Sequence, residues 1–220
     1  MDKRLITIGL AILAFSIFIK TAFVLLSNVK VDDFHKTSVV LIIDSSTSNQ
    51  KKLPEQIQYV RSLCATLDPE DSIKIIKTDK TSYLIYEGSP GESVAIYKAL
   101  NKYTQNGSRQ NSYGEALKKA VNYSLTMKKN GYNTSIIVIG SLDDNGDIEK
   151  RINWDVFPKN IENTKQYLPE LSMMFAFSDP EKLDFVKTKL NPIFGETKLI
   201  IVNDANISKA NTKFLKAIDR

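Results

Sequence analysis

Short apolar runs alternate along this chain with stretches in which apolar residues recur every three or four positions. Runs of four to eight mostly β-branched or leucine residues predict buried strands, and the longer spacing predicts helices with one apolar face. The expected strands are 38–43, 72–78, 80–87, 134–139, 171–177 and 198–202. The expected helices are 54–67, 91–103, 113–129, 180–190 and 207–218, and residues 148–170 are expected to mix loop with short helix.

Strands that alternate with helices predict parallel crossovers and an α/β fold. The turn between strands 72–78 and 80–87 is short enough to require an antiparallel hairpin. We therefore expect residues 37–220 to form one doubly wound, mostly parallel six-stranded sheet with one antiparallel edge strand and helices on both faces.

The N-terminal end of the chain has a different character. Residues 1–4 are short and basic, and Leu5–Leu26 is apolar apart from four residues, one of them Lys20. A helix of this length spans about 33 Å, which matches a bilayer core of about 30 Å. A lysine near the end of such a span can extend its ammonium group to the interface. We therefore expect one transmembrane helix ahead of the domain, as an uncleaved signal anchor at residues 5–27, and a polar linker at residues 28–36.

The basic residues 1–4 favour a cytoplasmic N-terminus, which places the domain on the extracytoplasmic side of the membrane. The alternative is a signal peptide, whose cleavage would release a secreted domain. The apolar stretch is not followed by a site of the Ala-x-Ala type, which favours the anchor.

Composition excludes several classes of function. The net charge of +5 comes from scattered lysines and arginines, with no basic run interleaved with aromatic residues, so we expect no nucleic-acid partner. Cys64 is the single cysteine, which excludes an intrachain disulfide and a cysteine metal cluster. His35 is the single histidine and lies in the linker, so neither a zinc site nor a Ser-His-Asp triad is expected.

Three oxygen-bearing side chains follow the first predicted strand directly: Asp44, Ser46 and Ser48. Open α/β sheets bind ligands at the carboxyl ends of their strands. A carboxylate and two hydroxyls suit a small hard cation such as Mg²⁺ or Mn²⁺. The same residue types are also ordinary turn and helix-capping residues, which leaves a purely structural interpretation open.

The sequence Asp44-x-Ser46-x-Ser48 after a hydrophobic strand resembles the metal-ion-dependent adhesion site of the von Willebrand factor A domain family. In that family a second loop supplies a threonine in a Thr-x-x-Gly-x-Ala-Leu segment, and Asn111 stands at that position in Asn111–Leu117. A third loop supplies an aspartate directly after a strand. Here Gly140-Ser141-Leu142 occupies that place, and Asp143 comes two residues late. The metal ligands that the resemblance implies are Asp44, Ser46, Ser48, Asn111 and Asp143, around Mg²⁺ or Mn²⁺.

The resemblance implies a membrane-anchored protein-binding module of a bacterial envelope, in which an acidic side chain of the partner completes the coordination of the cation. The alternative is a metal-independent structural or assembly subunit of an envelope complex in which the metal site has decayed. The sequence offers no nucleophile with an activating partner and no second metal cluster, so we expect neither an enzyme nor a small-molecule substrate.

Overall fold

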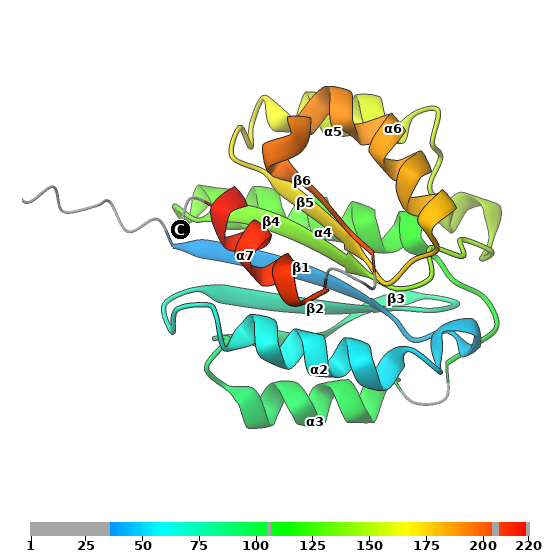
Figure 1. The fold of residues 1–220 in the computed structure, drawn as a ribbon, viewed down its shortest axis with the longest axis horizontal. Helices are drawn as coiled ribbons and strands as arrows, with labels where there is room; N and C mark the ends of the chain where they lie inside the picture. The colour runs from blue at the N-terminus through cyan, green and yellow to red at the C-terminus, as the bar shows by residue number, and fades with distance from the viewer. Residues whose placement is uncertain (1–35, 105–106, 204–206, 219–220) are drawn as a thin grey trace, which may run out of the picture. The chain divides into compact units, whose positions relative to one another are not determined.

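A computed structural model describes residues 36–104, 107–203 and 207–218 of the chain (Figure 1). Residues from Lys36 onward form one compact unit built on a six-stranded sheet with the order β3-β2-β1-β4-β5-β6. The strands are β1 (Thr37–Asp44), β2 (Ser72–Thr78), β3 (Ser82–Gly88), β4 (Asn133–Ile139), β5 (Ser172–Ala176) and β6 (Leu199–Val202). β3 pairs antiparallel with β2, and all other neighbours pair in parallel. The predicted mostly parallel sheet with one antiparallel edge strand is confirmed.

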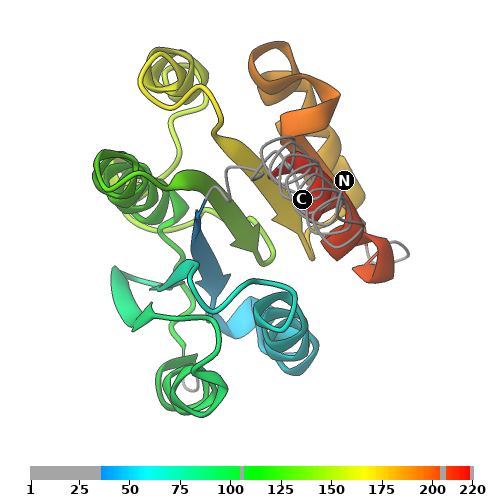
Figure 2. The ribbon, with the colours of Figure 1, turned by 90° about the vertical axis from the view of Figure 1, so that its left-hand side faces the viewer.

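Helices cover both faces of the sheet, as predicted (Figure 2). They are α2 (Leu53–Cys64), α3 (Ser93–Thr104), α4 (Tyr113–Lys129), α5 (Phe157–Lys165), α6 (Pro180–Lys198) and α7 (Ile207–Ala217), with short 3-10 helices at Thr47–Asn49 and Ile148–Lys150. The apolar residues of α2, α3 and α7 share one core cluster, and those of α4, α5 and α6 share the other.

β1 lies near the middle of the sheet and is buried on both faces. Because successive side chains of a strand point to opposite faces, Leu41 and Ile43 enter the core under α2, while Val40 and Ile42 enter the core under α4. The strand ends at Asp44, in register with the last residue of β2. The carboxyl ends of β1, β2 and β4 therefore meet at one edge of the sheet, which we call the loop end.

The structure differs from the prediction at α6, which was expected to stop at Leu190. The helix continues through Pro192 to Lys198, with a break at Gly195, where φ is +65°. A side chain added at Gly195 would meet no other atom within 4 Å, so glycine is needed there for its left-handed backbone rather than for space. This turn leads the chain directly into β6.

Among the described residues, no helix is both long and apolar enough to cross a membrane. The predicted cytoplasmic segment 1–4, the predicted span 5–27 and the linker up to His35 lie outside the described residues.

Candidate functional site

Asp44 is fully buried at the end of β1, and its carboxylate joins three loops. One oxygen, Oδ1, accepts a hydrogen bond of 2.8 Å from the backbone N–H of Ser46. The other, Oδ2, accepts three hydrogen bonds: from the hydroxyl of Tyr113 at 2.9 Å, and from the hydroxyl and the backbone N–H of Ser141 at 2.8 Å and 3.1 Å. Each carboxylate oxygen has about two lone-pair sites, so Oδ2 has no free lone pair, while Oδ1 keeps one.

The other residues of the first and second loops gather beside this carboxylate. The hydroxyls of Ser46 and Ser48 lie 3.0 Å apart, and the side-chain Nδ2 of Asn111 lies 3.5 Å from the hydroxyl of Ser46. The orientation of the Asn111 amide follows from its other contacts. Its Oδ1 accepts from the hydroxyl of Thr78 at 2.9 Å and from the backbone N–H of Ser112 at 3.0 Å, and a backbone N–H can only donate. Asn111 therefore presents an N–H group, rather than an oxygen, to Ser46.

The third loop reaches Asp44 through Ser141 rather than through the predicted Asp143. The carboxylate of Asp143 forms an ion pair with Lys182 of α6, whose ammonium group also donates to the backbone carbonyl of Ser141 at 3.1 Å. Only the backbone N–H of Asp143 contributes to the cluster, through a 3.2 Å hydrogen bond to the Ser141 hydroxyl. The structure therefore brings together Asp44, Ser46, Ser48 and Asn111 and turns the fifth predicted ligand toward Lys182.

Tyr113 is the residue that sequence reasoning missed at this site. Its side chain is fully buried, and its hydroxyl donates to Asp44 and accepts from the backbone N–H of Leu142 at 3.2 Å. Burial, together with the negative charge of Asp44, raises the pKa of Tyr113 well above its usual value, so the phenol keeps its proton. Gly140 permits this close packing, because an added Cβ would collide with both Asp44 and the Tyr113 hydroxyl.

Asp144 anchors the same loop to the start of α4. Its Oδ1 accepts from the backbone N–H of Tyr113 at 3.0 Å, and its Oδ2 accepts from the backbone N–H of Ile152. Burial raises the pKa of this carboxyl, although the two N–H groups oppose the rise. A carboxylate that accepts from the first N–H groups of a helix stabilises the helix end.

We call Asp44, Ser46, Ser48, Asn111, Tyr113 and Ser141 the Asp44 cluster. Mg²⁺ and Mn²⁺ need oxygen ligands with free lone pairs. In the cluster, Asp44 already accepts four hydrogen bonds, and Asn111 offers a donor. No group of three or more acidic, histidine or cysteine residues among those described is placed to hold a metal ion. With Oδ2 saturated and an N–H group of Asn111 facing Ser46, this arrangement does not fit a divalent cation bound through Oδ2 unless Tyr113 and Ser141 leave that oxygen.

Residues 39–144 match the family model of the von Willebrand factor type A domain. This segment of the chain is therefore similar to a von Willebrand factor type A (vWA) domain. Domains of this family commonly mediate protein interactions. The matched segment begins in β1 and ends at Asp144, so it includes all three loops that form the Asp44 cluster.

Solved structures with the same fold are distant in sequence. Proximal thread matrix protein 1 from the mussel byssus superposes with a TM-score of 0.53 at 12% identity, over 84% of this chain and 48% of that chain. A von Willebrand factor type A protein from Catenulispora acidiphila superposes with a TM-score of 0.55 at 13% sequence identity, over 83% of this chain and 42% of that chain. The protein BatB from Bacteroides thetaiotaomicron superposes with a TM-score of 0.53 at 13% sequence identity, over 84% of this chain and 100% of that chain.

At these identities the likeness shows the fold alone. The chain spans less than half the length of the mussel and Catenulispora structures. A comparison with curated protein sequences gives no match.

Proposed function

We propose that this protein is a membrane-anchored protein-binding module whose loop end contacts another protein without a bridging metal ion. The role is binding or assembly rather than catalysis. The observation that carries the proposal is the Asp44 carboxylate, which accepts four hydrogen bonds from three separate loops. These bonds hold the loops in the place where the family resemblance implies a cation.

The proposal favours the metal-independent alternative over the metal-dependent one. In a metal-dependent module, an acidic side chain of the partner completes the coordination of Mg²⁺ or Mn²⁺, and a chelator releases the partner. In the hydrogen-bonded arrangement, the carboxylate oxygens of Asp44 already accept hydrogen bonds from Tyr113, Ser141 and Ser46. The partner then contacts the outer surface of the loops, and chelation has no effect.

Membrane attachment through residues 5–27, with the domain on the extracytoplasmic side, is part of this proposal. Its support is the length and apolar character of the segment and the basic residues 1–4. Protease added to intact cells should degrade the domain, and the mature protein should retain its N-terminus. A mature chain that begins after residue 27 would indicate the secreted alternative instead.

Photo-crosslinking in living cells tests the binding role. A photoreactive amino acid replaces Thr47 or Ile148, which are exposed in the first and third loops. The control position is Lys129, exposed at the end of α4 that is farther from the loop end. We expect a discrete crosslinked protein from the loop positions, not from Lys129, and the same yield after EDTA treatment of permeabilised cells.

Two results would contradict the proposal. Crosslinks that are equally frequent at the control position would argue against a binding surface at the loop end. Crosslinks that vanish with EDTA and return with Mn²⁺ would support the metal-dependent module.

A further inference from the structure

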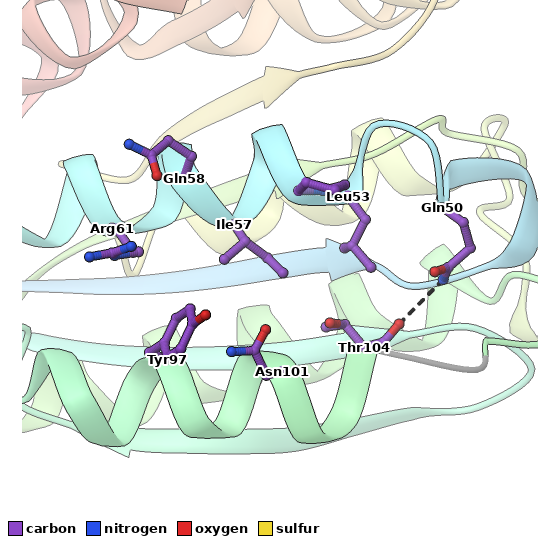
Figure 3. A pocket seen from close by; sticks show the side chains of 9 residues that line it. Gln50, Leu53, Ile57, Gln58, Arg61, Tyr97, Asn101 and Thr104 are labelled. Carbon is purple, nitrogen blue, oxygen red and sulfur yellow. Dashed lines mark hydrogen bonds between the residues drawn. The ribbon is translucent and has the colours of Figure 1, made fainter.

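A groove runs between α2 and α3 and encloses about 390 Å³; one end borders the first loop at Gln50, and the other end lies away from the Asp44 cluster at Arg61 (Figure 3). One wall is a single stripe of α2, with Leu53, Ile57 and Arg61 at intervals of four residues. The other wall comes from α3, including Tyr97 and Asn101, also four residues apart. Residues at this spacing lie on one face of a helix, so the two helices present facing stripes.

The character of the groove changes along its length. Leu53 and Ile57 make the middle apolar, and Figure 3 shows Arg61 and Tyr97 facing each other at one end. At the other end, the side chain of Gln50 closes the groove. Its amide donates to the carbonyl of Thr104 at 3.3 Å, as drawn in Figure 3, and to that of Ser45 at 2.9 Å.

Among the described residues that line the groove, none is acidic. Arg61 is the one charged residue among the described residues that line the groove, and its guanidinium lies 5.4 Å from the centre of the Tyr97 ring. No carboxylate of the described residues forms an ion pair with it. A guanidinium stacked on an aromatic ring is held in place while its N–H donors stay available.

Apolar side chains are also exposed on α3 beside the charged end. Tyr97 is 46% exposed, and Val94, three residues before it, is 66% exposed. Exposed apolar side chains that lie next to one another beside a groove are typical of an interaction surface. A symmetric contact with a second copy of this chain would place the same groove on both sides of the interface. Two concave surfaces that face each other do not fill one another, so a second copy is not the expected occupant.

We propose that the groove between α2 and α3 binds an amphipathic helix of a partner protein that carries two apolar side chains one turn apart and an acidic side chain one turn further. The apolar pair packs on the half-buried Ile57 and on the small exposed part of Leu53, which is 5% exposed at the floor of the groove, and the carboxylate pairs with Arg61. Leu53 and Arg61 are eight positions apart in α2, which is about 12 Å at helical rise, and positions i, i+4 and i+8 of a partner helix span the same length. This proposal concerns a different surface from the loop end and stands or fails independently of the proposed function.

The test uses two fluorescent peptides of about 15 residues, stapled because unrestrained helices of this length are marginal in water. Both carry leucine at positions i and i+4. One carries glutamate at i+8 and the other lysine. Fluorescence anisotropy with the full chain should give a dissociation constant about tenfold lower for the glutamate peptide, as expected for one charge pair worth about 1.4 kcal/mol.

Substitutions then locate the binding site. Arg61→Glu should reverse the preference between the two peptides, and Tyr97→Ala should weaken binding of the glutamate peptide. The matched control is Lys189→Glu on α6, where a cation likewise lies over an aromatic ring, 5.5 Å from the centre of Phe185. Equal affinity for both peptides, no change with Arg61→Glu, or no binding of either peptide by the folded protein would overturn the proposal.

Discussion

The hydroxyl of Tyr113, at the first residue of α4, donates a 2.9 Å hydrogen bond to Oδ2 of Asp44, at the last residue of β1. Both side chains are fully buried. This bond joins the first and second loops inside the domain, and the same hydroxyl accepts from the backbone of the third loop at Leu142. The pair therefore connects all three loops of the cluster.

Tyr113→Phe should destabilise the domain by about 1–3 kcal/mol, because it removes a hydrogen bond to a buried charged group and leaves the N–H of Leu142 without its acceptor. Urea unfolding followed by circular dichroism measures the loss. The matched control is Tyr59→Phe, since the buried hydroxyl of Tyr59 contacts the sulfur of Met174 at 3.6 Å, a weak acceptor. Equal effects of the two substitutions would argue against a special role for Tyr113.

Metal binding should be absent in the natural chain and should appear when the family pattern is restored. We expect no heat when Mg²⁺ or Mn²⁺ is titrated into the full chain in detergent. The triple variant Asn111→Thr, Tyr113→Phe and Ser141→Asp removes the N–H donor at Ser46 and two hydroxyl donors from Asp44, and adds a carboxylate. Calorimetry should then detect Mn²⁺, and Asp44→Ala in the same background should abolish the signal.

Alkaline pH should destabilise the domain through its buried tyrosines. Burial and the nearby charge of Glu92 raise the pKa of Tyr86 to about 12, and the pKa of Tyr113 is raised well above its usual value. The unfolded chain has tyrosine pKa values of about 10, so the folded state holds these protons more tightly. The stabilisation is complete below about pH 10 and is lost as pH rises toward the folded values.

Unfolding free energies at about pH 9 and pH 11, with absorbance at 295 nm as the reporter of phenolate, measure this loss. The decrease should be smaller in Tyr113→Phe than in the parent chain, because the variant lacks one of the tyrosines whose pKa is raised by burial. Ionisation of all tyrosines near pH 10 in the folded domain would contradict the buried environment of Tyr113.

Cys64 should be unreactive in the folded domain. The thiol is buried in the core under α2, and burial raises its pKa to about 11, so little thiolate exists near neutral pH. Iodoacetamide at about pH 8 should modify Cys64 only after the domain unfolds in denaturant. Rapid modification without denaturant would mean that α2 opens readily, and the groove lined by α2 would then lack a stable wall.

Much of the fold could be predicted from periodicity alone. The alternation of apolar runs and helical spacing gave the mixed sheet, and Tyr113–Lys129 was predicted with the bounds that α4 has. The prediction missed the extension of α6, because Pro192 usually marks the end of a helix and the left-handed turn at Gly195 lies beyond it. The helix propensities of the residues do not indicate at which position such a left-handed turn occurs.

The candidate site could be predicted only in part. Asp44, Ser46 and Ser48 follow a buried strand, so their position at the loop end was predictable from local sequence. The ion pair of Asp143 joins residues 39 positions apart, and no local pattern indicates it. The bond of the Tyr113 hydroxyl could not be predicted, because an aromatic residue at the start of an amphipathic helix indicates core packing, and its partner Asp44 lies 69 positions away.

The most direct test of the central claim is a crystal structure of the protein grown with saturating MnCl₂, with anomalous diffraction recorded to locate manganese. We expect the Tyr113 and Ser141 hydroxyls within hydrogen-bond distance of Asp44, and no anomalous peak beside that carboxylate. A manganese peak bound by Asp44, Ser46 and Ser48, with the Tyr113 hydroxyl displaced, would contradict it and restore the metal-dependent adhesion site as the better description.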